Sequence, residues 1–400
     1  MKLPKITFWR VVFVLIVAVG AYSAYLRFFH GLGAATNLND HFPWGIWIGF
    51  DALCGIMLTA GGFTLMGAVH VFNIKEWRAI ARPALVTAFL GYALEAFALM
   101  FDLGKPWNIW HPLIMWNPHS VMFLVGWCVM LYLGIMALEF APVVFERFRL
   151  ERPMRILKII STPVVITGVI VAVIHQSALG SLYLIVPGKL HPLWYTPLLP
   201  VLFFVSAVAA GLAMTIFEST MSARHFNHAL EKPLLLSIGR VLLIALVVYN
   251  ILRIHDLVHS GSIRYAFAGG YEANMFWVEI ALTLLVPIAL LAIPRIRNNP
   301  LSLYIVSIVT VLGFVVNRLN VAVTGMESAS GVRYVPKWSE VSVTMMMVAF
   351  GIFWFALAVR YLPIFTHDPG VIPSRADGEG SPAHEAGGFL APLGMTPKPR

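Results

Sequence analysis

Ten long apolar runs constrain the fold of this chain more than any other feature of its sequence. They cover approximately residues 8–29, 44–72, 83–101, 119–142, 159–181, 198–220, 234–258, 275–294, 301–319 and 340–362. A helix needs about 20 apolar residues to cross the roughly 30 Å core of a bilayer, where an open backbone cannot satisfy its hydrogen bonds. We therefore predict an all-α integral membrane protein with about ten transmembrane helices.

Composition agrees with this prediction and excludes other classes. Hydrophobic residues make up 59% of the chain and charged residues 12%, whereas soluble domains carry about 25% charged residues. The net charge of +9 is spread over short loops, so we expect membrane lipid and no nucleic acid as a partner. Cys54 and Cys128 lie inside apolar runs without CxxC or CxxCH spacing, which excludes a cysteine-bound iron–sulfur cluster and a covalently attached c-type haem.

The distribution of basic residues predicts the orientation. With a cytoplasmic N-terminus, 15 Lys and Arg fall in the cytoplasmic stretches 1–10, 75–82, 147–158, 224–232 and 295–297. The opposite loops hold six, namely Arg27, Lys105, Lys189, Arg264, Arg333 and Lys337. By the positive-inside rule, we predict that both termini lie in the cytoplasm. The membrane is predicted to be the inner membrane of a bacterium. The Gly-, Pro- and Ser-rich stretch 366–400 is predicted to be a disordered cytoplasmic tail after the transmembrane domain of residues 1–365.

A weak internal repeat suggests how the helices are grouped. His41-Phe42-Pro43-Trp44 precedes the second run and His191-Pro192-Leu193-Trp194 the sixth, while Asp102-Leu103 ends the third run and Asp256-Leu257 the seventh. In each match the two motifs lie four apolar runs apart. We predict two related four-helix bundles, about 44–181 and 198–319, flanked by helices 8–29 and 340–362. Neither predicted repeat shows a broken helix pair, which argues against a secondary transporter.

Ionisable residues within these runs are functional candidates, because each costs at least about 2.5–3.5 kcal/mol in hydrocarbon. Arg82 and Glu139 lie near the predicted cytoplasmic face, and Arg318 is a further basic residue in the ninth run. Salt bridges that fix packing would account for about half of the set. A partly paired chain of such groups is also what a proton path requires, and we assign to it Glu95, Glu139, Glu218, Arg82, Arg240, Arg253, Asp256 and Glu279.

The stretch DLGKPWNIWHPLIMWNPH at 102–119 combines an acid, imidazoles and indoles. A quinol that releases two electrons also releases two protons, so its site needs acids or imidazoles at the ring oxygens and an apolar slot for the ring. Asp102, His111, His119 and the tryptophans 107, 110 and 116 supply these groups. Most of the Trp residues fit equally well in an aromatic belt at the membrane interface, but such a belt has no use for Asp102.

A b-type haem is the alternative redox group. It needs two histidines on different helices at matching depth. His175 lies inside the fifth run, whereas His70, His119, His255 and His259 lie near the ends of theirs. No convincing pair is present, and we expect no haem.

Several motifs resemble those of the NrfD-like family of quinone-interacting membrane subunits, also known from polysulfide reductase. They are HFPWGIWIGFDALCG (41–55), AGGF (60–63), VFN (71–73), RPALVTAFLGY (82–92), DLGKPWN (102–108), ALEFAPVVFER (137–147), HQSALGSL (175–182), KLHPLW (189–194), IFES (216–219) and AFAGGYEANMFWVE (266–279). The resemblance runs in order through about residues 36–365. Within the family it points to the HybB-type membrane subunits of periplasmic nickel–iron uptake hydrogenases.

The resemblance implies a ten-helix subunit without a redox cofactor of its own and outside the catalytic core. Such a subunit binds menaquinone or ubiquinone as substrate near the periplasmic face. A ferredoxin-like iron–sulfur subunit docks there, followed by a catalytic pair that is a hydrogenase in this branch, and some members couple the reaction to proton translocation. Other members serve different periplasmic reductases or multihaem cytochromes. The predicted quinone-binding residues are Asp102, His175, His111, Trp107, Trp44 and Asp51.

One position departs from the family pattern. Some hydrogenase-type relatives are expected to carry a carboxylate about five residues into the fourth helix, where this chain has Leu124. Glu95 lies at comparable depth on the third helix and is our candidate to replace that carboxylate. The alternatives are a rerouted or a missing proton path.

Overall fold

The computed structural model describes residues 7–185, 188–226 and 232–364. These residues are nearly all helical, and the pairing of Asn39 with Phe42 is an isolated bridge rather than a strand. Ten stretches are long and apolar enough to cross a membrane, as predicted. The chain is therefore a multi-pass integral membrane protein. The predicted tail at 366–400 lies outside the described residues.

The first half of the chain forms five of these spans. Its elements are α1 (Phe8–His30), α2 (Leu32–Ala35), the π-helix η1 (Trp47–Ala52), α3 (Leu53–Leu58), α4 (Gly61–His70), η2 (Lys75–Trp77), α5 (Arg78–Asp102), η3 (Pro106–Asn108), η4 (His111–Leu113), α6 (Val121–Phe148) and α7 (Glu151–Leu182). The second span combines η1, α3 and α4. The other four spans of this half are built around α1, α5, α6 and α7.

The second half forms the other five. Its elements are α8 (Leu199–Phe226), α9 (Lys232–His259), η5 (Ser262–Phe267), α10 (Tyr271–Ile280), the π-helix η6 (Ala281–Leu285), α11 (Val286–Ala292), α12 (Pro294–Arg297), α13 (Pro300–Leu319), the π-helix η7 (Asn320–Thr324), α14 (Gly325–Ser330) and α15 (Trp338–Tyr361). The eighth span combines α10, η6 and α11, and the ninth combines α13, η7 and α14.

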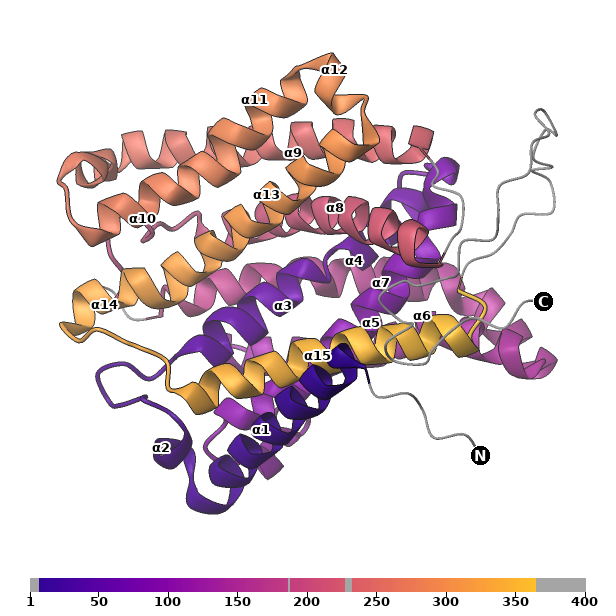
Figure 1. The fold of residues 1–400 in the computed structure, drawn as a ribbon, viewed down its shortest axis with the longest axis horizontal. Helices are drawn as coiled ribbons and strands as arrows, with labels where there is room; N and C mark the ends of the chain where they lie inside the picture. The colour runs from indigo at the N-terminus through magenta and orange to yellow at the C-terminus, as the bar shows by residue number, and fades with distance from the viewer. Residues whose placement is uncertain (1–6, 186–187, 227–231, 365–400) are drawn as a thin grey trace.

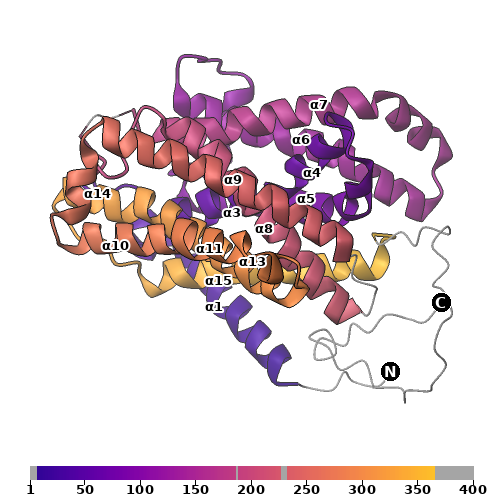
Figure 2. The ribbon, with the colours of Figure 1, turned by 90° about the horizontal axis from the view of Figure 1, so that it is seen from above.

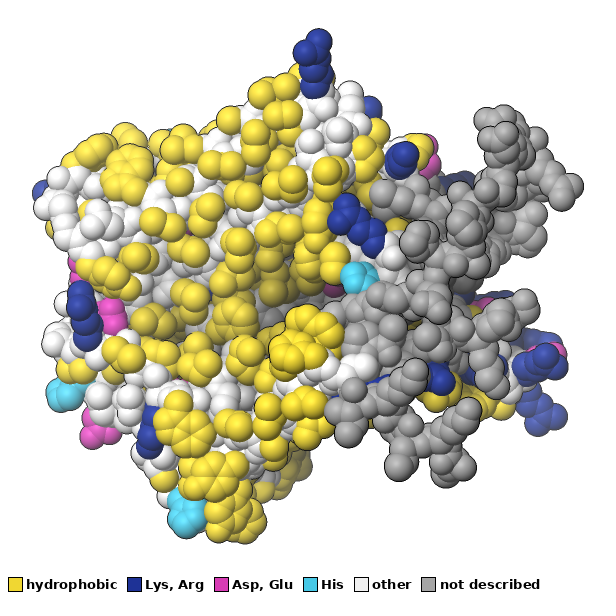
Figure 3. Space-filling model, in the orientation of Figure 1, with side chains coloured by type: hydrophobic (Ala, Val, Ile, Leu, Met, Phe, Trp, Pro, Cys, Tyr) yellow, Lys and Arg dark blue, Asp and Glu magenta, His cyan; other side chains and the backbone are white. Residues whose placement is uncertain are grey.

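The helices pack in two groups with a flanking pair (Figures 1 and 2). Helices α4, α5, α6 and α7 contact one another, as do α8, α9, α13 and the α10–α11 span. Helix α8 joins the groups through α7, α4 and α3, while α1 pairs with α15 and α15 packs on α5. On the face in Figure 3, hydrophobic side chains cover the middle and most charged ones lie toward the two ends. The membrane orientation and the repeat relation stay predictions.

The α6–α7 pair is longer than its hydropathy indicated. The sequence predicts helix to residue 142 and again from 159, but α6 continues to Phe148 and α7 begins at Glu151. The intervening residues are rich in Arg, and Pro153 falls in the first turn of α7, where a proline is tolerated. The turn is tight because Arg149 adopts a left-handed conformation with φ of 55°.

The second span is interrupted near its middle, which the sequence reading did not anticipate. Helix α3 ends at Leu58 and α4 begins at Gly61, with a turn at Thr59 and Ala60. Gly61 lies against Gly211 of α8 so closely that a Cβ on Gly211 would be 2.4 Å from the backbone nitrogen of Gly61. Two glycines therefore allow the two helix backbones to touch at this break.

Candidate functional site

Asp102 lies at the C-terminal end of α5, beside a buried arginine from α1. Arg27 is 4% exposed and donates hydrogen bonds to the backbone carbonyls of Phe101 and Leu103. Its positive charge is close enough to attract Asp102. The Oδ1 atom of Asp102 is buried and has no hydrogen-bond partner within the described part of the chain. A buried acceptor of this kind is available to an external donor.

Glu340 of α15 brings a second carboxylate to the same region. Its side chain is fully buried and accepts hydrogen bonds from the backbone N–H groups of Asn37 (3.0 Å) and Lys337 (2.8 Å). The hydroxyl of Tyr334 donates a third hydrogen bond, at 2.5 Å. Glu340 lies near enough to Asp102 for the two negative charges to repel each other.

Asp51, Trp44 and Tyr183 complete this region. Asp51 in η1 is 8% exposed and accepts a 2.9 Å hydrogen bond from Thr344, one turn beyond Glu340 on α15. The ring of Trp44 meets that of Tyr183 edge to face at 5.5 Å. Burial, with the negative charge of Asp102 nearby, raises the pKa of Tyr183. We call Arg27, Asp51, Asp102, Tyr334 and Glu340, with the rings of Trp44 and Tyr183, the Asp102 cluster.

The other two predicted residues of the 102–119 loop are not brought into this cluster by any described contact. Trp107 is 67% exposed. His111 begins η4, which packs on α6, and its ring contacts that of Trp110. Trp110 and Trp116 are also exposed, as residues of an aromatic belt would be.

Glu95 and His175 form a second buried group, deeper in the first helical group. Glu95 of α5 is 3% exposed and His175 of α7 is fully buried. Tyr92 lies beside both: it is three residues from Glu95 on α5, its hydroxyl lies 3.4 Å from Nδ1 of His175, and its ring meets Tyr132 of α6. Both carboxylate oxygens of Glu95 and Nε2 of His175 lack a partner among the described residues. Internal water or a proton on Glu95 would satisfy such atoms.

Glu139 and Glu218 occupy separate positions. Glu139 packs on α7 so tightly that a Cβ on Gly168 would lie 2.7 Å from its Oε1. It lies two turns along α6 from Tyr132, whose ring contacts Tyr92 of the Glu95 group. Glu218 of α8 lines a narrow cleft with Thr59, Thr87 and Thr215 beside the break in the second span; this cleft leaves no room for a water molecule.

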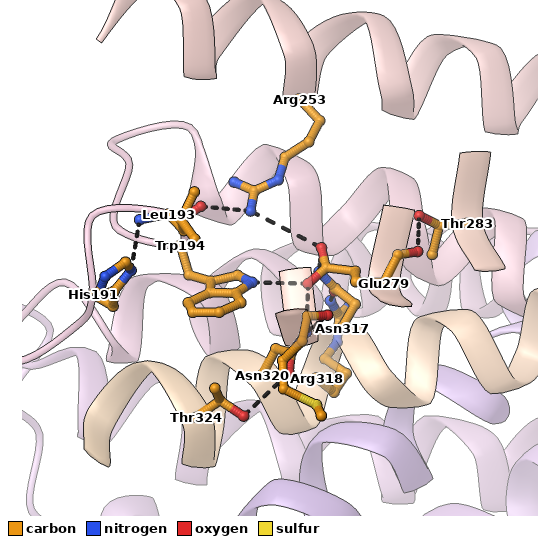
Figure 4. Close-up of polar contacts among 11 residues, drawn as sticks. His191, Leu193, Trp194, Arg253, Glu279, Thr283, Asn317, Arg318, Asn320 and Thr324 are labelled. Atoms are coloured by element: carbon orange, nitrogen blue, oxygen red, sulfur yellow. Dashed lines mark hydrogen bonds and ion pairs between the residues drawn. The ribbon is translucent and has the colours of Figure 1, made fainter. Parts of the chain in front are cut away.

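Figure 4 shows the most extensive buried network, around Glu279 of α10. Its Oε2 accepts hydrogen bonds from the indole of Trp194 (2.8 Å) and the amide of Asn320 (2.9 Å). Its Oε1 accepts one from Asn317 (2.8 Å) and lies 4.0 Å from the guanidinium of Arg253. Glu279 is 1% exposed and Arg253 is 2% exposed. This carboxylate is therefore fully partnered, unlike Glu95.

Arg318 extends the network toward α8. Its guanidinium donates to Asn317 (2.9 Å) and to Ser206 (2.8 Å), and it lies 3.7 Å from the centre of the Phe203 ring. The HPLW motif positions the indole of Trp194 on Glu279, and the carbonyl of Leu193 accepts a 2.7 Å hydrogen bond from Arg253. Burial lowers the pKa of His191, the first residue of that motif.

The remaining members of the predicted proton path lie outside these networks. Asp256 is half-buried and accepts a 2.6 Å hydrogen bond from Thr196. Arg82 forms an ion pair with Glu146 of α6 and is partly exposed, as expected near a membrane face. Arg240 is exposed on α9, and its assignment to the proton path stays a prediction. Its position in the seventh run gave no information about which helix face it occupies.

Sequence reasoning missed several participants. Arg27 was counted as a loop charge and Glu340 as the start of the last helix, yet both are buried at the Asp102 cluster. The amides of Asn317 and Asn320 carry no charge and so escaped a search for ionisable residues. Polar residues at helical spacing around Arg318 were the signal that would have found them.

The histidines of the described residues do not fit a bis-histidine haem. Only His175 is fully buried among them. His255 and His259 stack on each other at 5.9 Å, but both are exposed and belong to one helix. A haem within the helical core needs two facing imidazoles from different helices, and no such pair is present in the described part of the chain.

Comparison with known proteins identifies the family. The sequence profile described as polysulphide reductase, NrfD, matches residues 34–328. The chain belongs to the NrfD family. The match begins before the second span and ends within α14, so it includes both helical groups but excludes all of α1 and α15.

Three relatives match most of the NrfD-family chain. A protein of Nitratidesulfovibrio vulgaris is 34% identical, with coverage of 89% of this chain and 94% of its own length. The probable Ni/Fe-hydrogenase 2 b-type cytochrome subunit of Escherichia coli K12 is 33% identical, with coverage of 84% and 87%. The menaquinone reductase integral membrane subunit of N. vulgaris is 28% identical, with coverage of 92% and 94%.

Proposed function

We propose that this chain is the membrane subunit of a respiratory complex in the bacterial inner membrane and exchanges electrons between a periplasmic iron–sulfur subunit and quinone. The observation that carries the proposal is the Asp102 cluster. It combines a buried acid with a free oxygen, a buried guanidinium and two aromatic rings at one end of the helices. A quinone headgroup requires this combination of polar and apolar groups.

The chemistry assigns separate roles to the residues. Quinol oxidation releases two electrons and two protons. Asp102 accepts a proton from a ring hydroxyl as a general base, and the positive charge of Arg27 stabilises the carboxylate before transfer. Trp44 and Tyr183 provide an aromatic wall beside the ring. Asp51 and the deeper His175 are proposed as further polar groups of the same region.

The names of the relatives support the choice of substrate and partners. One is called a menaquinone reductase subunit and another a hydrogenase subunit. We infer menaquinone or ubiquinone as substrate and a ferredoxin-like iron–sulfur subunit as the electron partner. A nickel–iron hydrogenase is the proposed catalytic pair, and another periplasmic reductase or multihaem cytochrome is the alternative.

Replacing Asp102 with asparagine tests the proposal directly. Asp102→Asn preserves the shape but cannot accept a proton, so quinone-linked turnover is expected to fall by about 10²-fold or more. The measurement uses the complex isolated through a tag on this chain, with menadione and decylubiquinone as probes. Asp40→Asn, an exposed acid near the second span, is the matched control. Normal turnover of Asp102→Asn in an assembled complex would refute the role.

A haem-b anchor is the second candidate, because the E. coli relative is named a b-type cytochrome subunit. The visible spectrum of the purified chain separates the two functions. A reduced haem band that disappears in His175→Ala would establish the haem-b anchor. Quinone binding by a chain without such a band supports the quinone-linked function.

A further inference from the structure

A surface pocket lies next to the Asp102 cluster. It has a volume of about 270 Å³ and lies between the loop before η1 and the loop before α15. Most of its wall is polar or backbone, which makes it a water-accessible space rather than an apolar groove. The lining residues are Asn37, Asn39, Phe42, Arg333, Tyr334 and Val335 together with Val332.

Tyr334 separates this pocket from the interior. It is 7% exposed, and its ring stacks on Phe42 with centroids 4.8 Å apart. Its hydroxyl accepts a 3.0 Å hydrogen bond from the N–H of Ile46 and donates a 2.5 Å hydrogen bond to Glu340. A phenol oxygen has one proton and two lone pairs, so one lone pair remains for a further donor.

The hydroxyl of Tyr334 stays neutral in its surroundings. Burial, the hydrogen bond to Glu340 and the charges of Glu340 and Asp102 raise its pKa well above the ordinary value. The phenol therefore keeps its proton between transfers. Glu340 also lies close enough to Asp102 for the two charges to interact. Asp102, Glu340, Tyr334 and the pocket thus follow one another from the interior to the surface.

We propose that Glu340 and Tyr334 carry protons between Asp102 and the surface pocket during quinone turnover. This inference rests on the proposed function. In quinol oxidation the electrons leave to the iron–sulfur partner, and the proton on Asp102 passes to Glu340. In one concerted step the hydroxyl oxygen of Tyr334 accepts the proton held by Glu340 while its own proton passes to water in the pocket. Quinone reduction uses the same steps in reverse.

A purely structural role predicts different behaviour. Glu340 also fixes the start of α15 and the loop at Asn37 through backbone N–H groups. If that were its only function, loss of the Tyr334 hydroxyl would affect stability and assembly. It would leave the proton dependence of turnover unchanged.

Tyr334→Phe in the isolated native complex is the test, with menadiol or decylubiquinol as the probe. We expect turnover to fall by about tenfold or more, with a larger solvent deuterium isotope effect. Azide, a small proton carrier, should restore part of the rate. Tyr271→Phe is the matched control, because Tyr271 is exposed and stacks under Arg333 at the same end of the molecule.

A second variant keeps the test valid if Tyr334→Phe fails to assemble. 3-Fluorotyrosine at position 334 retains the hydroxyl but makes it a stronger acid, so the solvent deuterium isotope effect on turnover should change if this hydroxyl relays protons. An unchanged isotope effect in this variant, or a slower Tyr334→Phe without an isotope change or azide rescue, overturns the relay. Absence of quinol turnover in the wild-type complex, or normal turnover in Asp102→Asn, would instead contradict the proposed function.

Discussion

Glu95 and Glu279 show that two buried acids in one protein can have opposite surroundings. Glu279 has four partners, whereas both oxygens of Glu95 lack one among the described residues. A partnered carboxylate stabilises the helix packing around it. A carboxylate without partners is costly to bury as an ion, so it is better suited to hold and release a proton.

Glu279→Ala is expected to destabilise the protein by about 3–5 kcal/mol, because Arg253 and three donors would stay buried without their acceptor. Thermal unfolding of the purified chain in detergent measures this loss. Glu272→Ala, on the same helix but partly exposed, should change the midpoint little. Equal midpoints for the two variants would contradict a stabilising role for the network.

Glu95→Gln is expected to affect proton movement more than electron transfer. It removes the titratable group but keeps the volume, and the Tyr92–His175 contact remains. The proton-to-electron ratio of the complex in sealed vesicles should fall while the initial rate of quinone turnover falls less. An unchanged ratio would exclude Glu95 from the path.

At this scale the sequence predicts the acids well and their partners poorly. An acid in an apolar run is conspicuous, so Glu95, Asp102 and Glu279 were identified in advance. Their surroundings depend on residues distant in the chain, as in the contact between Asn37 and Glu340 across 303 positions. Hydropathy also does not show which face of a helix a residue occupies, so the exposed position of Arg240 on α9 could not be predicted.

At the scale of elements, the contact between α4 and α8 depends on two small residues. Gly211→Ala should cost at least about 2 kcal/mol, because its Cβ would overlap the backbone of Gly61 and neither helix can retreat without losing packing. Thermal unfolding again provides the measurement. Gly55→Ala in α3 is the control, since nothing lies within 4 Å of its added Cβ. A Gly211→Ala variant as stable as this control would show that the helices separate easily.

The positions of the helices follow from hydropathy, but their irregularities do not. All ten spans were predicted, because 20 apolar residues in lipid have few alternatives to a helix. The break at Thr59–Ala60 and the three π segments have no such signature. They depend on contacts with other helices, for example that of Gly49 in η1 with Ala322 in η7.

At the scale of the whole molecule, orientation can be measured by cysteine labelling. Cys54 and Cys128 are fully buried, so the wild-type chain should give little background with a membrane-impermeant maleimide. Asn108→Cys should react from the periplasmic side of intact cells, and Arg152→Cys only after permeabilisation. The reverse pattern would invert the predicted topology and place the Asp102 cluster at the cytoplasmic face.

The three π segments affect how the protein tolerates changes in chain length. A π turn holds more residues than the α turn it replaces, so η1, η6 and η7 are positions at which a span can lose a residue and become a regular helix. Because the π turn has already absorbed the extra residue, such a deletion would leave the flanking turns close to their present orientation. A deletion in a regular α turn would instead rotate the helix on one side by roughly 100°. In η1, Trp47 and Asp51 both reach α15. A change of chain length should therefore be tolerated within η1 unless it removes Trp47 or Asp51 itself, and it should alter the site when it falls in α3 beside it.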